Sequence, residues 1–381
     1  MIGSFLAFPS FLNTFTNVTA DDGSLQITAP WQSAITNGAY IGEILGLHAT
    51  GWIVDRYGNR FTMGLATTMM IAFIFISFFS LTLGGQLAGQ ILCGIPWGAY
   101  QTITTVYASE VLPVALRGYL TSYVNLCWVI GQFIASGVLK GFADTESKIG
   151  WQIPYAIQWA WPVPILFVCF FCPESPSWLV RHGKLREAEQ SLRRLQSADA
   201  GADVPTPQET VAMLHETDNI EKELVAGATY TECFRGTNLR RTEIATITWV
   251  VQQMCGPVLQ TYATYFYLQA GLATDQAFSL TLGMVCISFS CYRRLLTWLS
   301  QYALAFVGTC LSWPLINTLG RRTIFLWGLY GILGSLLIVG FIGIASATNV
   351  GASWAIGSFL LIFTFICKHA YLADVCESHD Y

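Results

Sequence analysis

The sequence predicts an all-α protein that crosses a membrane many times, because apolar residues are abundant and charged residues are few and clustered. Of the 381 residues, 53% are hydrophobic and 11% are charged, and the mean hydropathy is +0.49. Soluble domains carry roughly 25% charged residues. The clustering leaves apolar stretches of about twenty residues, which is the length of helix that crosses a bilayer core.

The same composition excludes several classes of protein. The formal net charge is −4, and no basic face is dense enough to predict a nucleic-acid partner. The 11 cysteines are scattered, and the C-x-x-C of Cys169 and Cys172 has no second pair nearby, so we interpret them as packing residues. No nucleophile–base pair or metal cluster stands out, so no enzyme, cofactor or metal is predicted. Met1 begins in an apolar stretch without a basic n-region, so no cleavable signal peptide is expected.

About ten apolar spans can be placed along the chain. The first is too short to cross a bilayer comfortably, and it looks like the second half of a helix whose start is missing. The apolar surface of the spans predicts the lipid bilayer as a partner. The spans are 1–15, 31–54, 62–83, 86–108, 119–139, 152–172, 244–272, 278–316, 323–345 and 353–366.

Charges in the loops predict the orientation of the spans. Lys and Arg collect in cytoplasmic loops, so the arginine-bearing loops after the second, fourth, sixth and eighth spans are expected in the cytoplasm. The alternate loops are acidic, with Lys140 and Lys148 as their cations. Asn17-Val18-Thr19 is a glycosylation sequon on the predicted outer side.

A polar stretch from Pro173 to Arg241 separates two groups of spans. Leucine and alanine recur at helical spacing between Leu185 and Leu195, which predicts an amphipathic helix. We interpret the stretch as a solvated cytoplasmic linker, with a break at 201–207. The predicted domains are an N-terminal bundle at 1–172, the linker at 173–241 and a partial C-terminal bundle at 242–366.

Four short motifs lie at the ends of the spans. Gly51-x-x-x-Asp55-Arg56-x-Gly58-x-Arg60 follows the second span, and Asn317-x-x-Gly320-Arg321-Arg322 echoes it one half-chain later. The echo indicates two related halves. The other two motifs are Glu110-Val-Leu-Pro-Val-Ala-Leu-Arg117-Gly118, after the fourth span, and Pro173-Glu174-Ser175-Pro176-Ser-Trp178-Leu179, after the sixth.

In this order, the motifs resemble those of the sugar porters of the major facilitator superfamily over nearly the whole chain. The resemblance implies two six-helix bundles around a site near the bilayer midplane, here incomplete at about ten spans, in a monomer at the plasma membrane. It also implies an intracellular gating network that latches the two halves; plain anchoring of cations at the membrane is the alternative. The network comprises Asp55, Arg56, Arg60, Glu110, Arg117, Glu174, Arg321 and Arg322.

Three stretches are more specifically similar to the α-glucoside (maltose-like) permeases of fungi, namely Gly42 to Gly46, Cys93 to Gly98 and Tyr119 to Gly131. Gln90 stands where many hexose porters place an arginine, and Asn125 where they place a glutamine. The resemblance implies alternating-access transport of an α-glucoside such as maltose, with the sugar and protons as partners.

Candidate sugar contacts are amide and aromatic side chains within the spans, because a sugar needs donors and acceptors inside an apolar cavity. The pair Gln252-Gln253 matches the sugar-binding glutamine pair of the family. Asn125, Trp128 and Gln132 are spaced at i, i+3 and i+7, so they share a helix face. Hydrogen bonding between helices is the alternative for any single amide. The full set is Gln252, Gln253, Gln260, Tyr262, Asn125, Trp128, Gln132 and Gln90, with Trp97 and Tyr265 nearby.

Glu43 is the one carboxylate well inside an apolar span. A buried carboxylate prefers its neutral form, so Glu43 is a candidate proton carrier, and hexose facilitators commonly have glycine at this position. A structural carboxylate bonded to an adjacent helix is the alternative. Gly38, Gly42 and Gly46 share a neighbouring face and should let another helix pack closely.

The chain departs from the family at three points. The acidic residue that the family has in its first helix has no counterpart. The span 278–316 is about twice the length that a bilayer needs, and without 285–301 a normal span remains. Val285-Cys286 can be encoded as the splice donor GTATGT and Gln301 as the acceptor CAG, so we hypothesise that 285–301 is a translated intron. The resemblance is expected to end at Ile366, which leaves 367–381 as a tail outside the family.

Three alternatives to a proton symporter stay open from the sequence. An uncoupled hexose facilitator is possible because the first-helix acid has no counterpart. A nutrient sensor built on a transporter fold would usually carry long cytoplasmic tails. A non-functional fragment is the third alternative, since helices expected for the family are missing.

Overall fold

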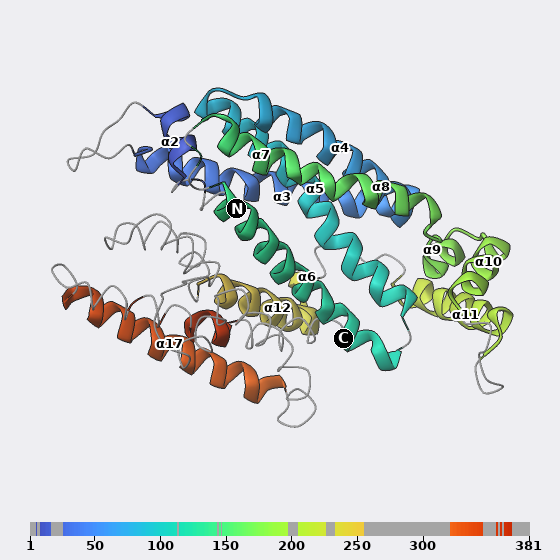
Figure 1. Cartoon of the computed structure of the whole chain (residues 1–381). Helices are drawn as coiled ribbons and strands as arrows, with labels where there is room; N and C mark the ends of the chain where they lie inside the picture. The colour runs from blue at the N-terminus through green and yellow to red at the C-terminus, as the bar shows by residue number, and fades with distance from the viewer. Residues whose placement is uncertain are drawn as a thin grey trace, which may run out of the picture. The chain divides into compact units, whose positions relative to one another are not determined.

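The computed structural model describes residues 5, 8–16, 26–112, 114–142, 145, 147–196, 205–225, 233–254, 321–345, 356, 359 and 362–367. Every regular element in these ranges is a helix (Figure 1), in agreement with the predicted all-α class. Contacts divide the chain into two compact units. They are Met1–Thr36 with Thr121–Tyr155 and Ile244–Tyr381, and Asn37–Leu120 with Ala156–Glu243. The predicted domain boundaries at residues 172 and 241 follow the order of the spans along the chain, and they stay predictions.

Long helices occupy most of the predicted spans that the structure describes. Three stretches of the described chain are long and apolar enough to cross a membrane, namely Asn59–Phe79, Ile149–Phe171 and Thr323–Ile342. The span 278–316 and the hypothetical intron segment 285–301 lie outside the described residues. The long helices are α3 (Ala29–Tyr57), α4 (Asn59–Phe79), α5 (Leu83–Val111), α6 (Val114–Gly141), α12 (Gly236–Met254) and α17 (Arg321–Ala345).

The sixth predicted span, 152–172, is a broken helix in the structure. α7 (Ile149–Ile157) and α8 (Pro162–Phe171) are separated by the 3-10 helix η1 (Gln158–Ala160). Pro162 has no N–H with which to continue the helical hydrogen-bond pattern, and proline is well suited to the first position of a helix. The break therefore has a local cause in the sequence.

Aromatic side chains in the first unit pack α2 (Pro9–Phe15) against α7. Trp151 is fully buried, and its Nε1 donates a hydrogen bond to Thr14 Oγ1 over 3.2 Å. Phe5 stacks on Tyr155 with ring centroids 5.0 Å apart. Aromatic pairs at such distances add about 0.5–1.5 kcal/mol beyond the area they bury. The short first span is thus held to the sixth.

In the second unit, α4 packs against both α5 and α8 (Figure 1). Met70, Ile74 and Cys93 form one buried cluster between these helices, against which Trp159 packs. The indole Nε1 of Trp159 donates to the carbonyl oxygen of Ile71 over 3.1 Å. Cys93 is therefore a packing residue, as its place in an apolar run predicted.

The helices α3 and α5 cross at glycines. A Cβ added to Gly42 would meet the carbonyl oxygen of Ile91, and one added to Gly94 would meet the carbonyl oxygen of Ala39, both well under 3.0 Å. These contacts involve backbone atoms, so any side chain would force the two helices apart. The predicted close packing at the α3 glycines is confirmed, and α5 is the partner.

The linker folds into three helices with a core of their own. They are α9 (Pro176–Arg181), α10 (Leu185–Leu195) and α11 (Pro207–Val225), and α10 is the predicted amphipathic helix. The core consists of Leu179, Val180, Ala188 and Val211. The linker is therefore a small folded module, and not only a solvated connection.

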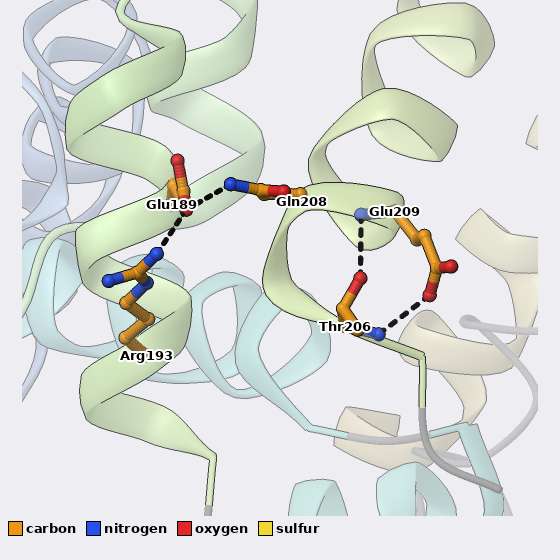
Figure 2. Close-up of polar contacts among 5 residues, drawn as sticks. All are labelled: Glu189, Arg193, Thr206, Gln208 and Glu209. Atoms are coloured by element: carbon orange, nitrogen blue, oxygen red, sulfur yellow. Dashed lines mark hydrogen bonds and ion pairs between the residues drawn. The ribbon is translucent and has the colours of Figure 1, made fainter. Parts of the chain in front are cut away.

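Polar contacts join α10 to α11 and cap the N-terminus of α11 (Figure 2). Glu189 on α10 accepts hydrogen bonds from Arg193 over 2.7 Å and from Gln208 of α11 over 3.1 Å. Thr206 caps α11, because its Oγ1 accepts from the N–H of Glu209 while its own N–H donates to the Glu209 carboxylate. This reciprocal pair is a capping box.

The capping box makes the start of α11 sensitive to pH. The backbone hydrogen bond from Thr206, followed by the side-chain one, lowers the pKa of the Glu209 carboxyl below its ordinary value. A lowered pKa in the folded state contributes stability at pH values above the unfolded pKa, and that contribution is lost as the pH falls through the lowered value. The cap is thus fully formed at neutral pH.

Candidate functional site

The carboxylate of Glu174 sits on the first turn of α4. It accepts hydrogen bonds from the N–H of Asn59 over 3.0 Å and from the N–H of Arg60 over 3.1 Å. Negative charge is favourable at a helix N-terminus, because the unpaired N–H groups and the helix dipole both attract it. The carbonyl oxygen of Glu174 in turn accepts from Ser191 of α10 over 2.6 Å. Glu174 therefore joins a membrane helix to the linker.

Gly58 allows this close approach. Its φ is +90°, a backbone conformation that favours glycine. A Cβ at Gly58 would lie 2.6 Å from Oε2 of Glu174, so a larger residue would also clash with the carboxylate. Both requirements explain the glycine in the motif that follows the second span.

Glu110, at the end of α5, ties the same cluster to α9. Its Oε2 accepts hydrogen bonds from Ser175 Oγ over 2.6 Å and from Asn59 Nδ2 over 3.4 Å. Asn59 is only 2% exposed, and its Oδ1 has no partner. Two carboxylates, Glu110 and Glu174, thus hold the start of α4, the end of α5 and the start of α9 together.

Arg56 and Arg60, the arginines of the motif that follows the second span, contact other groups. Arg60 donates from Nε to the carbonyl oxygen of Cys169 over 2.9 Å, and from its guanidinium to the carbonyl oxygen of Phe170. Both carbonyls lie in the last turn of α8, where a cation is favourable. Arg56 lies over the rings of Trp52 and Tyr57, at 5.8 and 5.9 Å from their centroids.

Part of the predicted gating network is therefore brought together. Among the described residues, the ion pairs do not join Arg56 or Arg60 to Asp55, Glu110 or Glu174. Asp55 takes part through its carbonyl oxygen, which accepts from Trp178 Nε1 over 3.3 Å. The side chains of Arg117, Arg321 and Arg322 lie outside the described residues. The function of the network as a latch stays a prediction.

Sequence reasoning missed Asn59 and Ser175 as members of this cluster. Ser175 could have been found, because it precedes Pro176 at a helix start and caps α9 through the N–H of Trp178. Asn59 carried no signal, since it stands at an unspecified position of its motif. Its contact with Glu110 depends on how α4 and α5 pack.

Replacing Glu174 by glutamine is expected to destabilise the second unit by about 2 kcal/mol, because a hydrogen bond to a charged group contributes about 1.5–3 kcal/mol to stability. The amide also turns a donor toward the N–H groups of α4. The thermal unfolding midpoint of the detergent-purified protein measures the loss. Glu187→Gln is the matched control, since Glu187 is 62% exposed and only 4.0 Å from Lys184. Equal midpoints for the two variants would contradict the role of Glu174.

Glu43 lies beside the crossing of α3 and α5. A Cβ on Gly94 would come within 2.9 Å of the Glu43 nitrogen, and one on Gly98 within 2.5 Å of its carbonyl oxygen. The side chain is half-buried, and within the described part of the chain no hydrogen bond or ion pair involves its carboxylate. The structural alternative, a bond to an adjacent helix, thus finds no support among the described residues.

The predicted sugar contacts are only partly described. Gln90 is buried on α5, and on α6 Trp128 is 54% exposed while Gln132 is half-buried. The helices that carry Asn125, Gln252 and Gln253 are described, but those side chains are not. Gln260 and Tyr262 lie outside the described residues. The sugar site therefore stays a prediction.

Comparison with known proteins links the chain to one family. Residues 1–376 match the model of the family described as sugar (and other) transporter. The match includes the segment 285–301 and runs past Ile366, where the resemblance was expected to end. The General alpha-glucoside permease of Saccharomyces cerevisiae is 38% identical over 370 residues, which is 96% of this chain and 56% of that protein. Maltose permease MAL31 of the same organism is 36% identical over 374 residues.

The chain spans 56% and 57% of the lengths of these two relatives. Among solved structures, the xylose transporter XylE from E. coli, in a partially occluded inward open conformation, has a TM-score of 0.75 at 17% identity. The match covers 100% of this chain and 82% of that one. A second XylE structure, described as a major facilitator superfamily proton:xylose symporter, has a TM-score of 0.71. At this identity the likeness shows the fold alone, which is the major facilitator fold expected from the motifs.

Proposed function

This chain belongs to the sugar (and other) transporter family, and from that premise we propose that it moves an α-glucoside such as maltose together with protons by alternating access. The observation that carries the proposal is the identity of 38% over 96% of the chain with a permease named for α-glucosides. The chain is a multi-pass membrane protein, and we place it in the plasma membrane as a monomer.

The proposal assigns roles to the predicted site residues. The amides of Gln90, Asn125, Gln132, Gln252, Gln253 and Gln260 would bind sugar hydroxyls, with Trp128 and Tyr262 against the ring. Glu43 would carry the proton, and its half-buried place without a partner in the described residues supports this role. The cluster around Glu110 and Glu174 would fasten the cytoplasmic ends of the helices until the bundles move.

Uptake of radiolabelled maltose tests the proposal. A transporter-deficient host expresses either the chain as it stands or a version without 285–301, and uptake is measured with and without a proton uncoupler. The proposal expects accumulation above the external concentration that the uncoupler abolishes. Equilibration of maltose across the membrane that the uncoupler does not change would instead establish an uncoupled facilitator. Correct insertion in the membrane without uptake of any sugar offered would refute transport.

A further inference from the structure

Three glutamines on α5 differ in what they contact. Gln86 is fully buried, and its Nε2 donates to the carbonyl oxygen of Ser77 over 2.9 Å. Gln90 is also buried. Gln101 has a buried Oε1 with no hydrogen-bond partner, and its side chain donates to no other described residue. Glutamine on the same helix thus has a hydrogen-bond partner at position 86, whereas the amide oxygen at position 101 has none.

Gln101 shares a line along α5 with two residues already expected to meet the sugar. Gln90, Trp97 and Gln101 are seven and eleven residues apart, which is close to two and three full turns. The line is about 16 Å long at the helical rise per residue. An amide, an indole and a second amide therefore follow one another through the middle of this helix.

Gln90, Trp97 and Gln101 are not among the residues that the contacts of α5 with α3 and α4 place at these crossings. The contacts with α3 are made by Gly94 and Gly98. The contacts with α4 are made on another side, by Ala99 and Ile103, which are buried against Ala66. Gln101 lies seven residues after Gly94, so the line runs along the edge of the α3 contact and on a different side of α5 from Ala99 and Ile103.

We infer that Gln101 is a further sugar-contacting residue, placed nearer the cytoplasm than Gln90 and Trp97. The inference rests on the proposed function. The buried amide oxygen of Gln101 has no partner, which costs free energy, and polar groups inside membrane helices usually face a solute path or another helix. A carboxamide offers both a donor and an acceptor to a sugar hydroxyl. Because α5 runs from the outer side to the cytoplasm, Gln101 would bind the sugar late, before release.

Replacement by leucine separates this role from a structural one. Gln101→Leu removes an amide that has no partner, so the thermal unfolding midpoint is expected to stay the same or rise. The KM for maltose is expected to rise about fivefold, as the loss of one hydrogen bond predicts, with Vmax changed less than about twofold. Gln101→Asn keeps the amide and should recover part of the affinity.

Gln86→Leu is the matched control on the same helix. It removes the donor to the Ser77 carbonyl, so its unfolding midpoint should fall while the KM of the folded protein stays unchanged. A KM within about twofold of the parent for Gln101→Leu, or a loss of folding in that variant, would overturn the assignment. If the parent chain takes up no sugar, the proposed function fails and the assignment falls with it. Uptake with an unchanged KM in Gln101→Leu refutes the assignment alone.

Discussion

Replacing Gly42 and Gly46 together by alanine is expected to destabilise the protein by about 2–6 kcal/mol. Each added methyl would overlap a backbone carbonyl of α5, at Ile91 and Ile95 respectively, and overpacking costs about 1–3 kcal/mol at each site. The pair would remove much of the roughly 5–15 kcal/mol by which domains are stable. The thermal unfolding midpoint and the height of the monodisperse peak in size-exclusion chromatography of the detergent-solubilised protein should both fall.

Gly64→Ala is the control for this experiment. A Cβ on Gly64, in α4, meets nothing within 4 Å, and alanine is a better helix former than glycine by about 1 kcal/mol. The control should therefore be as stable as the parent or slightly more stable. A folded double variant whose midpoint matches that of Gly64→Ala would contradict the close crossing of α3 and α5.

Replacing Glu43 by glutamine is expected to abolish accumulation of sugar against a gradient. Glutamine has nearly the same shape but cannot gain and lose a proton, so it cannot couple sugar to the proton gradient. The ratio of internal to external maltose should fall to about one, the value for equilibration. The unfolding midpoint should stay unchanged, because no described residue bonds to this carboxylate.

The two readouts distinguish a proton carrier from a structural carboxylate. Continued accumulation in Glu43→Gln would show that another group couples transport. Lost uptake with a fall in the unfolding midpoint would point to the structural alternative. Glu187→Gln, which changes an exposed linker carboxylate, controls for the removal of a negative charge and should accumulate sugar normally.

The sequence predicted the helices well because lipid-length apolar runs leave few alternatives. The ends of the helices were predicted less accurately. α5 extends from Leu83 to Val111, beyond the expected 86–108, because Thr82 caps it through the N–H of Gly85 and the two glycines that follow do not stop it. The break before Pro162 was missed, although three prolines between 154 and 164 signalled it.

The cluster of Asn59, Glu110, Glu174 and Ser175, called here the cytoplasmic cluster, shows what sequence patterns leave undetermined. The resemblance grouped Glu174 and Arg60 in one predicted network without specifying which group each of them contacts. The structure gives Glu174 the backbone N–H groups of α4 instead, because Gly58 adopts a left-handed conformation that exposes them. The partner of a charge depends on backbone geometry that a motif does not specify. Gln101 was passed over for a similar reason, since only its packing shows an amide without a partner.

The hydrogen bond from Ser191 to the carbonyl oxygen of Glu174 connects the linker helices to the ends of the membrane helices. Arg194 on the same helix donates to the carbonyl oxygen of Phe171 over 2.8 Å, so α10 supports both the end of α8 and the residue that caps α4. Local unfolding of α10 would therefore withdraw two supports from the cytoplasmic cluster at once. The joined ends of α4, α5 and α8 are then only as stable as the linker module that supports them.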